Sequence, residues 1–550
     1  MKKKMELSRE AIACKEVGHT DINRRGSVVL TACFLLLVFL VPMAQIALDR
    51  GEVFEPMLSL PGKTGISIAA AVNYANQSVL KNIDQLETQI EEDSLLRRIF
   101  LPSMQYVFFR FLGHGNEKVL PGRNAHLFYS AGIDYLLAQS FIDPGELEKK
   151  TMDHNVWESS IQPDPVAAIM HFRDQLALRG IDLLIVPIPV KGGIEPENFV
   201  DGSFTRPLRN RGWSSFVSQL EEQNVRLFDV GPVLVDYSRR HGGAFLRTDT
   251  HWLSGAMEDM AQRLAEYIDT AYPHLSGREN EFKLRAEDVI GSGDIAGMLT
   301  LPADVKLSPL EQVTINQVLS QEDEYWQADP GSGVLLLGDS FTNMYSFKGL
   351  GWGFGAGLPE HLSFRLRMSL DLIARNDSGA FTTREILARE LSRGRDRLEG
   401  KRLVVWEFSE RELSSGNWKM VELNLKEPVD SGFFVSGPGE KRTVTGLVSS
   451  ISASPRPGSV PYKDNIVTLH LVETEEDGRD MELNQALVYG WGMRDNILMD
   501  LAAVRAGDKI TLKLSSWDDV EGENSSFRRT PLADELLELE LPNWGELVDE

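Results

Sequence analysis

The feature that most constrains the fold of this chain is a series of short apolar runs that alternate with helical sequence. The runs occupy residues 183–186, 225–229, 334–337 and 403–408. Helical segments at 164–178 and 212–223 precede the first two runs. Short apolar strands between helices indicate a mainly parallel sheet covered by helices on both faces. The expected fold class is therefore α/β, and ligands of such sheets gather at the carboxyl ends of the strands.

A second folded unit is expected because 550 residues exceed the size of one ordinary core. Beyond about residue 430 the pattern changes to turn-punctuated segments, with Gly-Pro-Gly at 437–439. Strand-like segments follow at residues 443–452, 466–472 and 509–514. We therefore expect an α/β domain at 115–428 and a mostly β domain at 429–550, for which an oligonucleotide-binding-type barrel is one possible fold.

The N-terminal region predicts a membrane anchor. Residues 26–48 carry no charge and are long enough to cross a bilayer. Arg24 and Arg25 precede this segment, so the positive-inside rule keeps residues 1–25 in the cytoplasm and exports the body. The expected location is the inner membrane, with a single span and a periplasmic body; a cleaved signal peptide is the alternative.

Residues 49–114 are interpreted as a stalk or linker. Apolar residues recur at three- and four-residue steps between Val79 and Ile90, which predicts an amphipathic helix. This helix either lifts the body from the membrane or packs against the body. The cysteines, Cys14 and Cys33, both precede the body, so no disulfide can link parts of the body.

The charge of the chain excludes one class of ligand. The net charge is −24, and residues 1–25 hold seven basic and four acidic residues, which leaves about −27 on the remainder. A surface of this sign is unsuited to nucleic acid and to long-range attraction of polyanions. A neutral glycan, or a local basic groove, is compatible with it.

A serine that follows the third apolar run is a candidate nucleophile. In the sequence Gly338-Asp339-Ser340-Phe341 the strand ends at a glycine and a helix is expected to begin. Such a turn lifts the Ser340 hydroxyl to the edge of the sheet, where it needs a nearby base to become nucleophilic. The alternative is an ordinary helix cap made by Asp339 and Ser340.

A histidine about ninety residues earlier is the candidate base. Asp249 and His251 are two positions apart, so in an extended segment both side chains emerge on one face and the carboxylate can orient the imidazole. The alternative is a polar loop with a capping aspartate. A metal site is not expected, because only two ligands are evident where three or four are usual.

Together these motifs resemble the AlgJ/AlgX group of alginate O-acetylation proteins, whose fold is related to the SGNH hydrolases. The likeness spans about residues 115–420 and includes the segments 122–129 and 404–408. In ordinary SGNH hydrolases the serine comes before the aspartate and histidine. The order here is reversed, as it is in the AlgJ/AlgX group.

The resemblance implies that Ser340 is the nucleophile, His251 the general base and Asp249 its orienting partner, with no cofactor. The backbone N–H of Ser340 is the implied oxyanion donor, and Lys191 and Asn343 are candidates for a second donor or for substrate positioning. In AlgX-like proteins a C-terminal module binds polysaccharide. Tyr489, Trp491 and Trp517 are therefore candidates for stacking on sugar rings, the alternative being that they fill a β core.

The sequence thus predicts an exported, membrane-anchored O-acetyltransferase that modifies a cell-envelope or secreted polysaccharide. The resemblance implies that a membrane-bound O-acyltransferase supplies the acetyl groups. The first alternative is a polysaccharide acetyl esterase with the same three residues, and the second is a non-catalytic glycan-binding scaffold. Transfer and hydrolysis need the same side chains and differ in how well water is excluded.

Overall fold

The computed structural model describes residues 24–36, 39 and 95–548, with gaps at 153–160, 276–279, 303–304, 306–309, 377–378, 393–394, 424, 426–432, 458–459, 461, 477, 482, 533–536 and 538–539. The stalk helix expected at 79–90 lies outside these residues. Helix α2 (Arg24–Leu35) covers the first half of the apolar segment, and most of the second half lies outside the described residues. Among the residues described, no helix combines the length and the apolar character that a membrane span requires.

The α/β domain is built on one sheet of five strands. They are β3 (Asp182–Ile188), β4 (Arg226–Leu227), β7 (Val334–Gly338), β8 (Asp371–Ala374) and β9 (Leu403–Ser409). Their order in the sheet is β4-β3-β9-β7-β8, and each pairing is parallel. The expected parallel sheet is confirmed, and edge strand β8 adds to the four strands that the apolar runs predicted.

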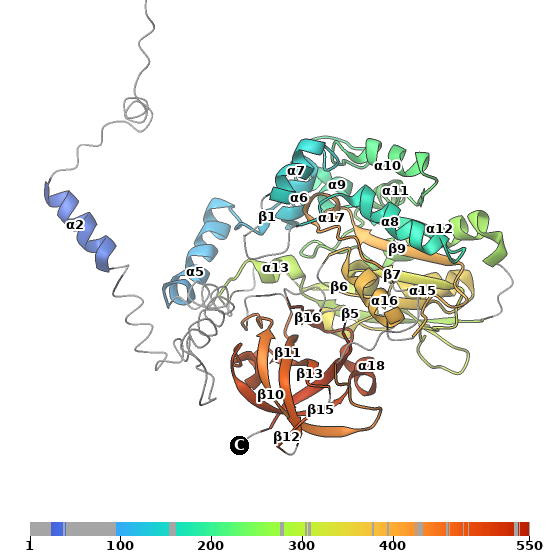
Figure 1. Ribbon diagram of the computed structural model, residues 1–550. Coiled ribbons are helices and arrows are strands. Elements are labelled where there is room, and N and C mark those ends of the chain that lie inside the picture. The colour runs from blue at the N-terminus through green and yellow to red at the C-terminus, as the bar shows by residue number, and fades with distance from the viewer. Residues whose placement is uncertain are drawn as a thin grey trace, which may run out of the picture.

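Helices cover both faces of this sheet (Figure 1). One face packs against α8 (Pro165–Ala177), α10 (Trp213–Glu222) and α16 (Thr382–Ser392). The other packs against α11 (Gly231–His241), α12 (Ser254–Ala271) and α15 (Leu358–Leu366). Successive strand residues alternate between the two cores, as Leu335 and Leu336 do, which is why the strands read as continuous apolar runs.

Shorter elements surround the sheet. An antiparallel hairpin joins β5 (Lys283–Gly291) to β6 (Glu311–Leu319), and its connection carries α13 (Asp294–Met298). The other helices of the α/β part are α5 (Leu95–Val107), α6 (Ser130–Leu137), α7 (Pro144–Met152), α9 (Lys191–Ile194), α14 (Ser340–Asn343) and α17 (Glu412–Ser415). The small hairpin of β1 (Val119–Pro121) and β2 (Leu127–Tyr129) packs against α13 through a cluster that includes Leu127 and Ile295.

The C-terminal domain is a closed β structure, shown in orange and red in Figure 1. Its main strands are β10 (Lys441–Ile451), β11 (Asn465–Glu476), β13 (Gln485–Arg494), β15 (Lys509–Ser516) and β17 (Pro542–Leu547). They pair in the ring β11-β10-β15-β17-β13-β11, and within the ring only β13 and β17 run parallel. The shorter elements are β12 (Arg479–Asp480), β14 (Ile497–Leu498), α18 (Glu521–Asn524) and β16 (Arg528–Thr530). A five-stranded ring of this kind is the barrel that the sequence allowed, and its closure leaves no free edge among the five strands.

Candidate active site

The serine lies at the carboxyl end of β7, where the strand turns directly into α14. Gly338 ends the strand, and a Cβ at this position would meet the Thr342 side chain at 2.1 Å, so the turn needs glycine. One oxygen of Asp339 accepts a hydrogen bond from Phe341 N at 2.8 Å, and its other oxygen accepts one from Ser409 N at 2.9 Å. Asp339 therefore caps α14 and ties it to β9. The neighbouring Ser340 is only 8% exposed.

The aspartate and histidine lie in a tight bend and not in the extended segment that the sequence suggested. A bridge between Phe245 and Trp252 closes the bend, and Leu246 N donates to His251 O at 3.1 Å. Inside it, His251 N donates to Asp249 Oδ1 at 3.0 Å. The two side chains face each other because this hydrogen bond folds the carboxylate back toward the imidazole. The expected pairing is therefore present, but in a bend and not in an extended segment.

The structure brings the three side chains into one hydrogen-bonded row. His251 Nε2 lies 2.8 Å from Ser340 Oγ, and His251 Nδ1 lies 2.6 Å from Asp249 Oδ1. The second carboxylate oxygen of Asp249 accepts hydrogen bonds from Trp352 Nε1 at 2.9 Å and from Asp294 N at 3.1 Å. All three side chains are buried. A hydroxyl, an imidazole and a carboxylate in this order can activate the hydroxyl as a nucleophile.

The charges in the site suit a histidine base. Burial disfavours a charged imidazole, but the charge and hydrogen bond of Asp249, with a smaller contribution from Asp294, raise the pKa of His251 above its usual value. Burial also acts against an ionised Asp249, and the charge and hydrogen bond of His251 outweigh it and lower the pKa of Asp249 to about 2. The carboxylate thus stays ionised over the whole physiological range and supports a proton on the imidazole.

Lys191 and Asn343, the candidates for a second oxyanion donor, have other hydrogen-bond partners in the structure. The Lys191 ammonium donates to the carbonyl oxygens of Leu127, Leu246 and Arg247 at 2.6–2.8 Å and to that of Asp249 at 3.3 Å. Lys191 thereby holds the bend that carries Asp249 and His251. The ammonium donates to these carbonyls and not toward Ser340, so Lys191 supports the structure of the site.

Asn343 lies three residues after the serine and points toward the contact with the barrel. Its Nδ2 donates to Asn376 Oδ1 at 2.8 Å, and Asn376 Nδ2 donates to the carbonyl of Ser526 at 3.2 Å. The rings of Phe347 and Phe527 meet edge to face, 5.3 Å apart, at the same contact. The C-terminal domain therefore contacts the α/β domain close to the serine.

The aromatic residues proposed for sugar stacking lie mostly inside the barrel. Tyr489 is 2% exposed and Trp517 is 7% exposed, and their rings pack together 5.1 Å apart. Trp491 is half-buried, with Phe527 and Trp544 against its ring. The structure corrects the stacking interpretation for Tyr489 and Trp517, because a ring buried in a β core presents no open face to a sugar.

Three residues that the sequence did not single out complete the site. Glu311, the first residue of β6, accepts hydrogen bonds from Arg247 N and Thr248 N, each at 2.9 Å. Trp352 and Asp294 both donate to the Asp249 carboxylate. None of the three lies at a spacing that relates it to either motif. The one local signal for Asp294 is the preceding Gly-Ser-Gly at 291–293, and that pattern is common in turns.

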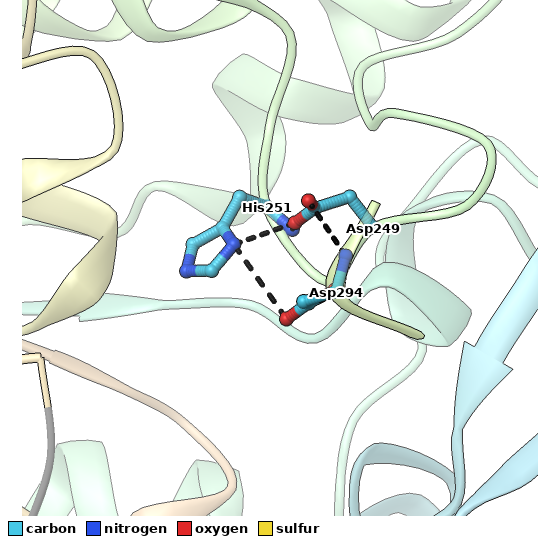
Figure 2. A group of neighbouring side chains, drawn as sticks. All are labelled: Asp249, His251 and Asp294. Carbon is cyan, nitrogen blue, oxygen red and sulfur yellow. Dashed lines mark hydrogen bonds and ion pairs between the residues drawn. The ribbon is translucent and has the colours of Figure 1, made fainter. Parts of the chain in front are cut away.

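Asp249, His251 and Asp294 are the one group of potential metal ligands found among the described residues, with ligand atoms within 4.8 Å of one another (Figure 2). Asp249 Oδ1 and His251 Nδ1 lie at hydrogen-bond distance, so a proton occupies the place between them. A metal bound to His251 Nδ1 would displace that proton and leave the imidazole unable to act on Ser340. The donor set fits a proton held between imidazole and carboxylates better than a cation.

The sheet, the turn after β7 and the aspartate–histidine bend define the class of the domain. Residues 149–410 match the family described as "SGNH hydrolase-like domain, acetyltransferase AlgX". The α/β part of this chain is therefore similar to the SGNH hydrolase-like domain of that family.

Individual proteins of one group within that class are also similar to this chain. The chain is 27% identical over 338 residues to the probable alginate O-acetylase AlgJ of Pseudomonas syringae pv. tomato, an alignment covering 60% of this chain and 78% of the relative. It is 24% identical over 345 residues to that of Pseudomonas fluorescens, covering 60% and 77%. These matches confirm the resemblance of the chain to the AlgJ/AlgX group.

Solved structures of the same group are also similar. The O-acetyltransferase domain of Pseudomonas putida AlgJ aligns with a TM-score of 0.40 and 22% identity, over 54% of this chain and 93% of that domain. Pseudomonas aeruginosa AlgX aligns with a TM-score of 0.39 and 11% identity, over 73% of this chain and 91% of that protein.

Proposed function

We propose that this protein is an O-acetyltransferase that moves acetyl groups onto hydroxyls of an exported or cell-envelope polysaccharide. The observation that carries the proposal is the hydrogen-bonded row from Asp249 through His251 to Ser340, with distances of 2.6 and 2.8 Å. The similarity to probable alginate O-acetylases supports the choice of a polysaccharide acceptor. An acetyl ester of a serine is the intermediate that this row is suited to form.

The first half-reaction acetylates the serine. Ser340 Oγ attacks the carbonyl carbon of the acetyl donor while His251 Nε2 takes the hydroxyl proton. The negative charge that develops on the acetyl oxygen is stabilised by the backbone N–H of Ser340. The imidazolium, paired with ionised Asp249, then gives its proton to the leaving group, and acetyl-Ser340 remains.

The second half-reaction reverses these roles with a new partner. A sugar hydroxyl enters in place of the departed group, gives its proton to His251 Nε2 and attacks the acetyl carbon. Ser340 Oγ leaves and recovers the proton. Water in place of the sugar would give hydrolysis by the same steps, so exclusion of water decides between a transferase and an esterase.

We also propose the setting of the reaction. The apolar segment 26–48 acts as a single membrane anchor with residues 1–25 in the cytoplasm, so that the body works in the periplasm. A membrane-bound O-acyltransferase supplies the acetyl groups from the cytoplasmic side. Lys191 positions the bend that carries Asp249 and His251, and Asn343 lies at the contact with the barrel.

A transfer assay with purified full-length protein tests the proposal. The protein is given a chromogenic acetyl ester, with and without an O-deacetylated alginate oligosaccharide, and acetylated glycan is detected by mass spectrometry. We expect Ser340→Ala to form no acetylated glycan and to keep the wild-type thermal unfolding curve. Ser218→Ala, on the exposed side of α10, is the matched control and should act as the wild type does.

Three outcomes would contradict the assignment. Acetate release at one rate with or without the oligosaccharide, and no acetylated glycan, would identify an esterase. Wild-type activity in Ser340→Ala would exclude Ser340 as the nucleophile. Oligosaccharide binding without any turnover by the wild type would identify a scaffold.

A further inference from the structure

A second carboxylate, that of Asp294, lies against the same imidazole nitrogen as Asp249 (Figure 2). Asp294 is the first residue of α13, in the connection of the β5–β6 hairpin, more than forty residues from the histidine motif. Its Oδ2 is 3.9 Å from His251 Nδ1, which the closer Asp249 carboxylate contacts at 2.6 Å. The reaction steps assigned above to Ser340, His251 and Asp249 do not use this group.

The Asp294 carboxylate binds Thr250, the residue between Asp249 and His251. Its Oδ1 accepts a hydrogen bond from Thr250 N at 2.8 Å, and its Oδ2 accepts one from Thr250 Oγ1 at 2.6 Å. In return, Asp294 N donates to Asp249 Oδ2 at 3.1 Å. The carboxylate therefore fixes both the backbone and the side chain of Thr250, and its backbone steadies Asp249.

The chain reaches this position by a close backbone approach. A Cβ on Gly293 would lie 2.0 Å from the carbonyl oxygen of Thr248 and 2.6 Å from Asp249 N. Any residue larger than glycine at 293 would push the start of α13 away from the bend. Gly293 thus allows Asp294 to contact the bend. A capping residue at the surface would not need so close an approach.

The position of the threonine proton follows from these contacts. Because Thr250 Oγ1 donates its proton to Asp294 Oδ2, the oxygen presents a lone pair toward His251 Nδ1, which is 3.1 Å away. A lone pair at this place favours a proton on Nδ1, and a protonated Nδ1 leaves the lone pair of Nε2 free for the Ser340 hydroxyl. The Asp294–Thr250 contact and Asp249 therefore select the same tautomer.

The groups that face the imidazole have opposing charges. Asp249 and Asp294 favour the imidazolium, whereas burial and the charge of Arg411 disfavour it. The buried Lys191 ammonium lies near both carboxylates and Glu311. Burial and the neighbouring negative charge of Asp249 raise the pKa of Asp294 above its usual value, so the two acids are electrostatically linked.

We propose that Asp294 is a positioning residue of the acetyl-transfer site, which through Thr250 holds His251 in the tautomer protonated at Nδ1 and through its charge stabilises the imidazolium. This inference rests on the proposed function for its effect on the reaction. The placement of the imidazole proton does not depend on that function, and it can be measured in a protein that turns over no substrate.

The test uses one substitution that removes the charge, one that removes the hydroxyl and one that restores the hydroxyl. Asp294→Asn keeps the size of the side chain and an oxygen for Thr250 N, but removes the charge. Thr250→Val removes the hydroxyl and keeps the charge, and Thr250→Ser restores the hydroxyl. The histidines of the full-length protein are isotope-labelled, the His251 signal is assigned by its loss in His251→Gln, and its titration is followed by NMR alongside the pH profile of kcat/KM.

In Asp294→Asn we expect the pKa of His251 to fall by on the order of one unit, since a unit charge about 4 Å away is removed from a partly screened site. The acid limb of kcat/KM should move to lower pH by the same amount, and kcat at pH 8 should fall roughly tenfold because the base is weaker. Thr250→Val should lower kcat without moving the acid limb, and Thr250→Ser should restore it. KM should change little in all three.

A merely structural role predicts a different pattern. Asp294→Asn and Thr250→Val would then lower the thermal unfolding temperature alike and leave the titration of His251 unchanged, which would overturn the proposal. An Asp294→Asn variant that fails to fold leaves the Thr250 variants to decide it, and wild-type kcat in Thr250→Val would also overturn it. If the wild type proves inactive as a transferase, the NMR titration still shows whether Asp294 acts on His251.

Discussion

Replacing Lys191 by methionine is expected to destabilise the protein and to inactivate it, although the ammonium contacts neither Ser340 nor the imidazole. The substitution keeps a long, flexible side chain in place and removes only the charge and the donors. It takes from the carbonyl oxygens of Leu127, Leu246 and Arg247 the donor that now lies 2.6–2.8 Å from them, and among the described residues only Arg247 O keeps another, Leu127 N at 2.7 Å. The bend that carries Asp249 and His251 would lose one of its two hydrogen-bonded links to Leu127 of β2.

The size of the effect follows from two opposing contributions. A hydrogen bond to a charged group contributes roughly 1.5–3 kcal/mol, so three such bonds represent roughly 5–9 kcal/mol. Against this stands the cost of burying the ammonium, since burial lowers the pKa of Lys191 from 10.5 to about 8, equivalent to about 3 kcal/mol. The difference is roughly 2–6 kcal/mol. We expect a loss of about 3 kcal/mol in the free energy of unfolding, in the lower half of that range, because the bend can partly relax.

Urea unfolding at pH 7 and the acetyl-transfer assay measure the two effects on the same samples. Lys118→Met is the control, because Lys118 is an exposed lysine just before β1, and it should change neither quantity. For Lys191→Met we expect kcat to fall at least tenfold, since Asp249 would no longer be held at its present distance from His251. A loss below about 1 kcal/mol together with wild-type kcat would refute the view that the ammonium holds the bend.

Two further substitutions test the surroundings of the site. Trp352→Phe removes the indole donor 2.9 Å from Asp249 Oδ2, so we expect the pKa of Asp249 to rise and kcat to fall roughly tenfold, and unchanged kinetics would show that this donor is dispensable. Glu410→Gln tests a buried acid beside the site, because burial, partly opposed by Arg209, raises the pKa of Glu410 to about 7. A raised folded-state pKa gives stability that is present below the unfolded pKa and lost as pH rises through 7. Between pH 4.5 and 8 the unfolding free energy of the variant should therefore fall by roughly 3 kcal/mol less than that of the wild type, and parallel pH profiles would contradict this.

Three of the four strands that the sequence predicted are buried on both faces; the fourth, β4, is an edge strand. β3, β7 and β9 read as continuous apolar runs because helices cover them on both sides. Strand β8 escaped prediction because it begins with Asp371, a buried acid that Arg397 and Lys401 neutralise from a distant segment. The partners that make such a residue acceptable in a core are set by the tertiary fold and leave no local pattern.

In the candidate site, too, local patterns could be predicted and tertiary contacts could not. The serine turn and the aspartate–histidine pair could be found because each is a local pattern, and their reversed order indicated the AlgJ/AlgX group. Capping and nucleophile placement, treated as alternatives for Asp339-Ser340, occur together, since Asp339 caps α14 while Ser340 faces His251. Asp294, Glu311 and Trp352 could not be found, because only folding of the hairpin and of the segment after α14 brings them to the bend.

The pairing of β3 with β9 has a consequence for how the chain folds. Asp182 and Leu403 are register partners roughly 220 residues apart, and β9 lies between β3 and β7 in the sheet. The centre of the sheet therefore cannot close until nearly the whole α/β domain has left the ribosome. Such distant pairing slows folding and leaves apolar strands exposed in the meantime. The segment with Asp249 and His251 is made before the segment with Ser340. Ser340 therefore meets His251 only when the sheet is complete.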